Sequence, residues 1–104
     1  MAQVRWTLRA AQDIQDLESY IAADSPLHAS RFCDRLVDAG DGLSANPRLG
    51  RMVPEFRRQS LREIFYGAYR VVYLFRGDDV IILRVVHGAR DLRSLIRREP
   101  WDLA

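Results

Sequence analysis

Residues 69–91, YRVVYLFRGDDVIILRVVHGARD, decide the fold of this chain. They contain two runs of β-branched and aromatic residues, 71–75 and 80–86, and such runs are typical of strands. Between the runs, Gly77 can take a positive φ angle and the two aspartates after it tolerate turn geometry. The stretch therefore predicts a β-hairpin with its tip at residues 77–79.

The length of the hairpin loop decides which side chains share a face. With Gly77-Asp78 as a two-residue loop, Arg70 lies opposite Val85, whereas a three-residue loop would break this sorting. Side chains alternate along each strand, so they divide between two faces. One face carries Arg70, Val72, Leu74, Ile81, Leu83, Val85 and His87, and the other carries Tyr69, Val71, Tyr73, Phe75, Val80, Ile82, Arg84 and Val86.

Both faces of the predicted hairpin are mostly apolar. A hairpin with one face in water usually alternates apolar and polar residues. We therefore expect helices of this chain to cover one face. The other face is expected to need a cover from outside the chain, which is the first indication of a function.

The composition is that of a small globular protein. The chain has 104 residues, of which 48% are hydrophobic and 29% charged, and this suits one domain over residues 1–104. No apolar run is long enough for a membrane span, and the start does not resemble a signal peptide, so we expect a cytoplasmic protein without membrane contact. Cys33, the single cysteine, lies in a predicted helix and is interpreted as a buried structural thiol.

The basic residues are unusual in kind and in distribution. All sixteen are arginine, which favours bidentate contacts with carboxylates and phosphates, although a biased genome composition explains the absence of lysine equally well. Residues 48–104 carry twelve arginines against seven acidic residues, whereas residues 1–47 carry four against seven. The second half of the chain is therefore expected to meet nucleic acid or an acidic partner.

Two helices are predicted before the hairpin. Residues 3–7 form a short strand, and apolar residues then recur at helical spacing from Leu8 to Ile21, with Thr7 as the N-cap. The outer side of this helix is expected to carry Gln12, Asp13, Asp16 and Ser19. Ser25 is a good N-cap and Pro26 a good first helical residue, so a second helix begins there and runs to Asn46-Pro47. The short link between the helices predicts an antiparallel helical hairpin.

The remaining elements complete the predicted fold. Residues 47–60 are interpreted as an ordered loop, residues 61–66 as a strand, and residues 92–98 as a short helix that Asp91 caps. The element order is β-α-α-β-β-β followed by a short helix. We expect an α+β fold of two layers, in which the helical hairpin packs on an antiparallel sheet.

Many kinds of chemistry have no motif in this chain. It contains no P-loop, no GxGxxG and no GxSxG, and its two histidines and one cysteine do not have metal-ligand spacing. No cofactor and no metal site are therefore expected. His28, early in the second helix, is expected on the surface.

Arg70 and His87 are the residues that local structure explains least. Arg70 lies in an apolar strand, where a charge costs desolvation free energy unless it is paired, so it either forms a salt bridge with Glu63 or belongs to a site. His87 ends the last strand near Arg84 and Arg90. Arg70 is also expected near it. His87 is either a group that transfers protons or contacts an anion, or a hydrogen-bonded histidine at a strand end.

A third group of candidates is the cluster of arginines in and after the loop. Such a cluster is either a solvated basic loop or a specific site, and both interpretations stay open. The cluster comprises Arg51, Arg57, Arg58 and Arg62.

Several segments, taken together, resemble a known family. VRWT, YIAADSP, NPRLGRMVPEF, LREI, YRVVY and VVHGARDL occur in this order over nearly the whole chain. The set resembles the RelE/ParE superfamily of type II toxins. The resemblance implies a toxin that a co-encoded ParD-like or RelB-like antitoxin holds inactive by wrapping around it in a hetero-oligomer. The residues expected to contact the antitoxin are Arg70, Val72, Leu74, Leu83, Val85 and Arg84.

The superfamily contains two functional classes. RelE-like members cut messenger RNA in the ribosome, and ParE-like members inhibit DNA gyrase without known nuclease chemistry. Arg70 and Arg90 match the spacing of two arginines of the nucleases, and with His87 they would be the catalytic residues. Leu61 and Glu63, however, stand where those nucleases carry lysines.

The late tyrosine of the nucleases is also missing, with Ile96 near its position, and GRMVPEF, LREI and VHGARDL are more similar to ParE-like sequences. The resemblance therefore favours a gyrase inhibitor, which need not be an enzyme. The alternative is a ribosome-dependent messenger RNA endoribonuclease. The candidate contacts with the target are Arg93, Arg97 and Arg98 on the C-terminal helix.

Overall fold

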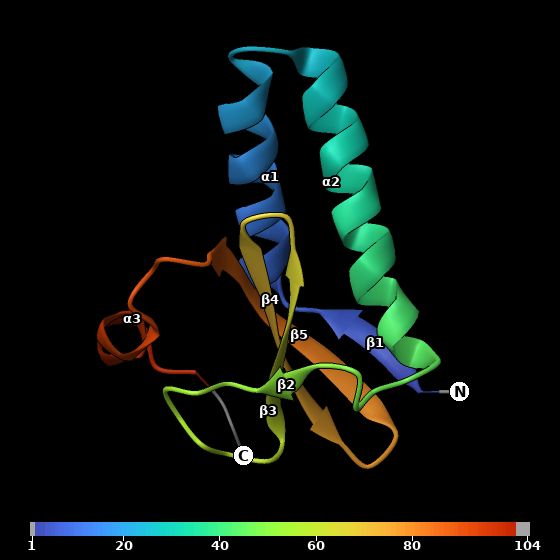
Figure 1. The fold of residues 1–104 in the computed structure, drawn as a ribbon, viewed down its shortest axis with the longest axis vertical. Coiled ribbons are helices and arrows are strands. Elements are labelled where there is room, and N and C mark those ends of the chain that lie inside the picture. Colours follow the sequence, from blue (N-terminus) through green and yellow to red (C-terminus); the bar gives the residue numbers. More distant parts are fainter. Residues whose placement is uncertain (1, 102–104) are drawn as a thin grey trace.

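The sheet of this protein contains five strands in the order β1-β5-β4-β3-β2 in residues 2–101, which the computed structural model describes (Figure 1). The strands are β1 (Gln3–Trp6), β2 (Arg51–Met52), β3 (Leu61–Tyr66), β4 (Tyr69–Arg76) and β5 (Asp79–His87). The helices are α1 (Leu8–Ala22), α2 (Pro26–Asp41) and α3 (Leu92–Arg98), with one 3-10 turn (Gly42–Ser44) after α2. The predicted α+β fold is thus confirmed.

Local sequence signals place most of the element boundaries. The Oγ1 atom of Thr7 accepts a hydrogen bond from the Ala10 N–H at 3.0 Å, and Ser25 and Asp91 cap α2 and α3 in the same way. The second helix is shorter than expected. It ends at Asp41, because the chain tightens into the 3-10 turn there.

The sheet is mixed, whereas an antiparallel sheet was predicted. The first strand, β1, runs parallel to β5, with Gln3 opposite Asp79 and Trp6 opposite Ile82. Only strands joined by a short turn must be antiparallel, and the helical hairpin separates β1 from the other strands. The segment expected to be a loop also contains β2, which pairs with β3.

A β-bulge changes the predicted faces of the hairpin. Gly77-Asp78 forms the expected two-residue loop, but Val72 lies opposite Arg84 whereas Tyr73 lies opposite Ile82. The extra residue on β5 is Leu83. Because a bulge shifts the alternation by one residue, the predicted sorting is wrong beyond it.

The consequences of the bulge appear in the packing on both sides of the sheet. Arg70 lies opposite Val86 and not Val85. Val85 packs with Val71 in the core under α1 and α2, and Val86 packs with Val72 on the other face. The sequence pattern had placed Val85 on the same face as Arg70.

The second face of the sheet is covered by this chain itself. Leu92 and Leu95 of α3 and Val53 of the preceding loop are buried against Val72 and Leu74. Phe56 and Trp101 pack at the rim of this cluster. The expectation that the face needs an external cover is therefore wrong, because apolar residues of α3 and the loop meet there.

Two further predictions concern single residues. Cys33 is buried, and burial raises the pKa of its thiol. His28 is exposed, as expected. In the part of the chain that the structure describes, no helix is both long and apolar enough to cross a membrane.

Candidate functional site

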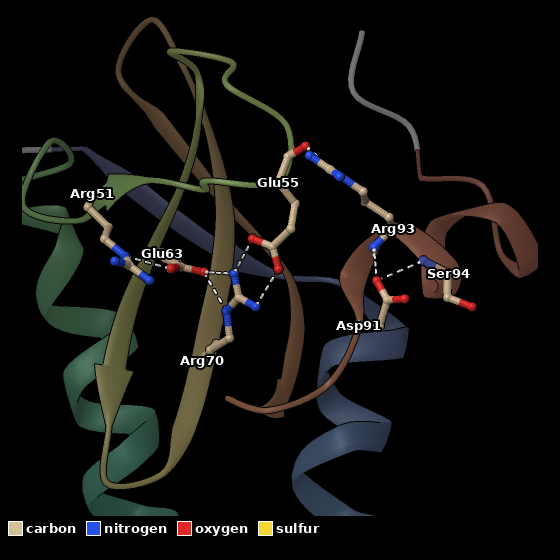
Figure 2. A network of polar contacts seen from close by, with 7 residues as sticks. All are labelled: Arg51, Glu55, Glu63, Arg70, Asp91, Arg93 and Ser94. Atoms are coloured by element: carbon tan, nitrogen blue, oxygen red, sulfur yellow. Dashed lines mark hydrogen bonds and ion pairs between the residues drawn. The ribbon is translucent and has the colours of Figure 1, made fainter.

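Arg70 lies at the centre of an ion-pair network on the face of the sheet that α3 covers (Figure 2). Its Nε donates to Glu63 at 2.6 Å, and its two terminal nitrogens donate to Glu55 at 2.8 and 2.7 Å. Arg51 donates to the other oxygen of Glu63 at 2.7 Å. The salt-bridge interpretation of Arg70 is thus confirmed, and Glu55 is a second partner that the sequence did not indicate.

The network is charge-balanced and largely closed to water. The Arg70 side chain is 5% exposed and the Glu63 side chain is fully buried. The hydrogen bond from Arg70 holds the pKa of Glu55 below its ordinary value, against the opposing effect of burial. The same pairing raises the pKa of Arg70. All three guanidinium nitrogens of Arg70 therefore bind carboxylates, which leaves this residue poorly placed to hold a phosphate.

The network also holds the C-terminal helix against the sheet. The Nε of Arg93 donates to the backbone oxygen of Glu55 at 3.2 Å (Figure 2). Asp91 caps the same helix through the N–H groups of Arg93 and Ser94. The loop, β3, β4 and α3 are thus joined through one set of polar contacts.

His87 and Arg90 lie in a different place, a groove of about 370 Å³ between α1 and the end of β5. The Nδ1 atom of His87 accepts a hydrogen bond from the Ala89 N–H at 3.1 Å. Its ring packs edge-on against the Tyr69 ring, with the two ring centres 5.5 Å apart. Burial raises the pKa of Tyr69. The groove is lined by Arg9, Asp13, Asp16, Leu17, Tyr20, Tyr69, Arg84, Val85, Val86, His87 and Arg90.

The three residues predicted as a nuclease site are therefore not gathered in one site. Arg70 does not line the groove that His87 and Arg90 share. His87 lies opposite Tyr69, next to Arg70 on β4, but successive side chains of a strand point to opposite faces. The guanidinium of Arg70 is directed to Glu55 and Glu63 (Figure 2).

Arg84 belongs to a second buried ion pair. It donates to both oxygens of Asp13 on α1, at 2.7 and 3.0 Å, and the Val85 N–H donates to the same carboxylate at 2.8 Å. A further salt bridge joins Arg84 to Glu99. Asp13 was predicted on the outer side of its helix. It faces inward because β1 ends at Trp6 and leaves the edge of β5 open to it.

The residues predicted to contact an antitoxin are all buried within this chain. Each of the six is at most 8% exposed, because α1, α3 and the loop before β3 cover them. These six residues are Arg70, Val72, Leu74, Leu83, Val85 and Arg84. In this conformation they support the core and do not form a free surface.

The arginines of α3 lie where the sequence predicted an exposed basic helix. Leu92 and Leu95 face the core, whereas Arg93, Arg97 and Arg98 are exposed. Arg97 and Arg98 occupy the last helical turn, where the helix dipole favours positive charge. Among residues 2–101, no group of three His, Cys, Asp or Glu side chains could hold a metal ion.

Comparison with protein-family models matches residues 4–92 to a family described as the ParE toxin of the type II toxin-antitoxin system parDE. Toxin RelE2 of Caulobacter vibrioides is 37% identical over 91 residues, which cover 86% of this chain and 99% of that protein. Toxin ParE3 of the same organism is 34% identical over 71 residues, or 68% of this chain and 70% of that toxin.

Two solved structures share the fold. A structure described as the chromosomal ParDE system of P. aeruginosa superposes with a TM-score of 0.70 at 20% identity, covering 84% of this chain and 96% of that one. The structure described as the RelBE2 toxin-antitoxin complex of Mycobacterium tuberculosis superposes with a TM-score of 0.60 at 27% identity. The match covers 83% of this chain and 96% of that one. The similarity extends to proteins that carry either the ParE or the RelE name.

Proposed function

Because this chain belongs to the ParE toxin family of type II toxin-antitoxin systems, within the RelE/ParE superfamily, we propose that it inhibits DNA gyrase by binding. A co-encoded antitoxin would neutralise it. Inhibition by binding needs no proton transfer and no nucleophile. The surface of the toxin then matters more than any single catalytic group.

The observation that supports this proposal best is that all three guanidinium nitrogens of Arg70 are paired within the chain. A nuclease of the RelE type would use this arginine to bind the scissile phosphate, but its donors are taken by Glu55 and Glu63. Releasing it would leave Glu63, which is fully buried, with Arg51 in place of two arginine partners. Removing one partner of a buried ion pair is strongly unfavourable. Glu63 also stands where the nucleases that the chain resembles carry a lysine.

The second candidate function, cleavage of messenger RNA, has one observation in its favour. His87 and Arg90 line the same groove and are both exposed, so an acid–base group lies near a cation there. Arg70 contributes nothing to that groove. A nuclease built on it would have to work without this phosphate-binding arginine.

The proposed contact with gyrase is the exposed basic side of α3. Arg93, Arg97 and Arg98 project from a helix whose opposite side is anchored in the core. Charges on an anchored helix need little reorganisation on binding. Electrostatic contacts of this kind add up over several arginines and weaken in salt.

The proposed antitoxin would form a hetero-oligomer with this chain, as the RelBE2 structure is described as a toxin-antitoxin complex. The six residues that the sequence suggested for this contact are covered, so the partner needs another surface. Leu8, Tyr20 and Leu27 on the helical hairpin are 91%, 77% and 61% exposed, and a partner would gain from covering them.

Controlled expression in growing bacteria tests the proposed function. A gyrase inhibitor should cause double-strand DNA breaks while translation continues at first, and co-expression of the protein encoded next to the toxin should restore growth. An immediate loss of translation with cleaved messenger RNA would support the second candidate instead.

A further inference from the structure

The connection between α2 and β3 places a strongly basic surface at the end of the sheet far from the turn between α1 and α2 (Figure 1). Residues 47–62 contain five arginines and a single acidic residue, Glu55. We call these five residues the basic edge: Arg48, Arg51, Arg57, Arg58 and Arg62. Glu55 binds Arg70 in the interior, whereas Glu63 binds both Arg70 and Arg51 and so neutralises one of the five charges.

Aromatic rings hold three of these arginines in place. The guanidinium carbons of Arg48 and Arg62 lie 5.2 and 5.4 Å from the centre of the Phe75 ring. Arg51 lies 5.2 Å from the centre of the Phe65 ring, which is itself 51% exposed. A stacked guanidinium has given up much of its rotamer freedom before any ligand arrives, which reduces the entropic cost of binding.

Arg62 also joins the two parts of the loop that carry the other charges. It donates to the Gly50 oxygen at 3.1 Å and to the Gln59 oxygen at 2.7 Å. Gly50 lies two residues from Arg48, and Gln59 lies two residues from Arg57. The exposed charges at the two ends of the loop are therefore held on one rigid framework.

The loop has further fixed points. The hydroxyl of Tyr73 donates to the Pro47 oxygen at 2.7 Å and accepts from the Gly50 N–H at 2.9 Å. Arg57 has a φ angle of +48°, which is unusual for a side chain of this size. A merely solvated basic loop would not need so many constraints around its charges.

We propose that the basic edge binds the phosphodiester backbone of a nucleic acid, and that the physiological source is the duplex DNA held by gyrase. The inference rests on the proposed function for that source. Planar guanidinium groups match phosphate oxygens, and several of them on one framework match a ligand with regularly repeated charges. Such contacts are independent of base sequence, as an inhibitor of gyrase on any DNA segment requires.

The test measures binding of the full-length toxin to a fluorescent duplex of mixed sequence by anisotropy, over a range of salt concentrations. The double variant Arg48→Gln/Arg57→Gln should bind about tenfold or more weakly at 0.1 M salt. In a plot of log affinity against log salt concentration, the slope for this variant should be less steep by about 0.9 for each DNA phosphate that the variant no longer neutralises. Arg58 and Arg62 stay unchanged because both make hydrogen bonds within the loop.

The matched control is Arg31→Gln/Arg35→Gln, which removes the same charge from two exposed arginines of α2. This variant should keep the duplex affinity within about twofold, since its charges lie outside the basic edge. Equal decreases in affinity for the two variants would overturn the proposal, because the attraction would then be a general effect of net charge. Unchanged thermal unfolding of both variants ensures that weaker binding does not reflect unfolding.

Two other ligands test which molecule supplies the phosphates that the basic edge binds. Tighter binding of a single-stranded RNA of equal length, with the same dependence on Arg48 and Arg57, would overturn DNA as the source. Equally tight binding of a polyglutamate peptide would overturn the nucleic-acid assignment altogether. A duplex that wild-type toxin does not bind would do the same.

Supercoiling by gyrase, assayed with the same preparations, separates this inference from the proposed function. Toxin that inhibits gyrase but does not bind the duplex contradicts the inference alone. Toxin that binds the duplex through the basic edge and leaves gyrase active contradicts the proposed function, and with it the DNA held by gyrase as the source.

Discussion

Arg70 and Glu55 form a bidentate ion pair, in which two guanidinium nitrogens donate to two carboxylate oxygens at 2.8 and 2.7 Å. A phosphate would bind an arginine in the same geometry. Glu55 thus takes up two donors that could otherwise bind a phosphate, and Glu63 accepts from the remaining nitrogen.

Arg70 should contribute to the stability of the fold. Arg70→Ala removes the buried partner of Glu63 and leaves that carboxylate paired with Arg51, and breaking a buried pair typically costs about 3–5 kcal/mol. Arg76→Ala, on the exposed end of the same strand, should change the unfolding free energy by less than about 0.5 kcal/mol. Urea unfolding measures both. A destabilisation below about 1 kcal/mol for Arg70→Ala would contradict the buried network.

The pH dependence of stability should report on Glu55. Its pKa is lower in the folded protein than in the unfolded chain, because Arg70 donates to its carboxylate. The resulting stabilisation is present above the unfolded pKa, about 4.3, and is lost as the pH falls through the folded value. Thermal unfolding of Glu55→Gln should therefore depend less on pH than that of wild type between about pH 5 and pH 3.

The exposed carboxylate Glu18 on α1 provides the control for this experiment. Glu18→Gln should follow the wild-type curve throughout the acid range. If Glu55→Gln and wild type lose stability in parallel below about pH 5, Glu55 is not held by Arg70 in solution.

Gly50 should tolerate no side chain. A Cβ atom there would lie 2.6 Å from the backbone oxygen of Glu63 and 2.7 Å from the Tyr73 hydroxyl, so Gly50→Ala should cost about 1–3 kcal/mol through overpacking. Gly42 has open space around it and helical φ, so Gly42→Ala should be neutral or stabilise by up to about 1 kcal/mol. The denaturant midpoints of unfolding of the two variants measure this difference. Equal midpoints would contradict the close packing around Gly50.

The arginines of α3 should act together in toxicity. Reversing the charge of Arg93, Arg97 and Arg98 together should abolish growth arrest, while each single change to alanine should only weaken it, because exposed charges contribute in small increments. Growth after induction and the thermal transition of each purified variant provide the measurement. A folded triple variant that remains fully toxic would exclude α3 as the contact with the target.

The local features of this fold were predictable from sequence, and the long-range ones were not. The Gly77-Asp78 turn and the caps Thr7, Ser25 and Asp91 depend on a few neighbouring residues, so their chemistry identifies them. The bulge at Leu83 depends on how β5 packs against other elements. No pattern within β5 reveals it.

In the candidate site, too, local contacts were predictable from the sequence and long-range contacts were not. The pairing of Arg70 with Glu63 was one of two open interpretations, since the two strands are adjacent in sequence. Glu55 lies in an irregular loop, and no periodicity brings it to Arg70. The cover of the second sheet face by α3 is likewise a matter of tertiary packing, and its apolar residues alone could equally indicate an external partner.

Supercoiling of relaxed plasmid by purified DNA gyrase is the assay for the proposed inhibition by binding. Added toxin should block supercoiling or trap cleaved DNA, its antitoxin should reverse the effect, and His87→Ala/Arg90→Ala should inhibit as well as wild type, because no catalysis is involved. Gyrase that stays fully active at an excess of toxin, while the same toxin stops translation in a cell extract, would contradict the account.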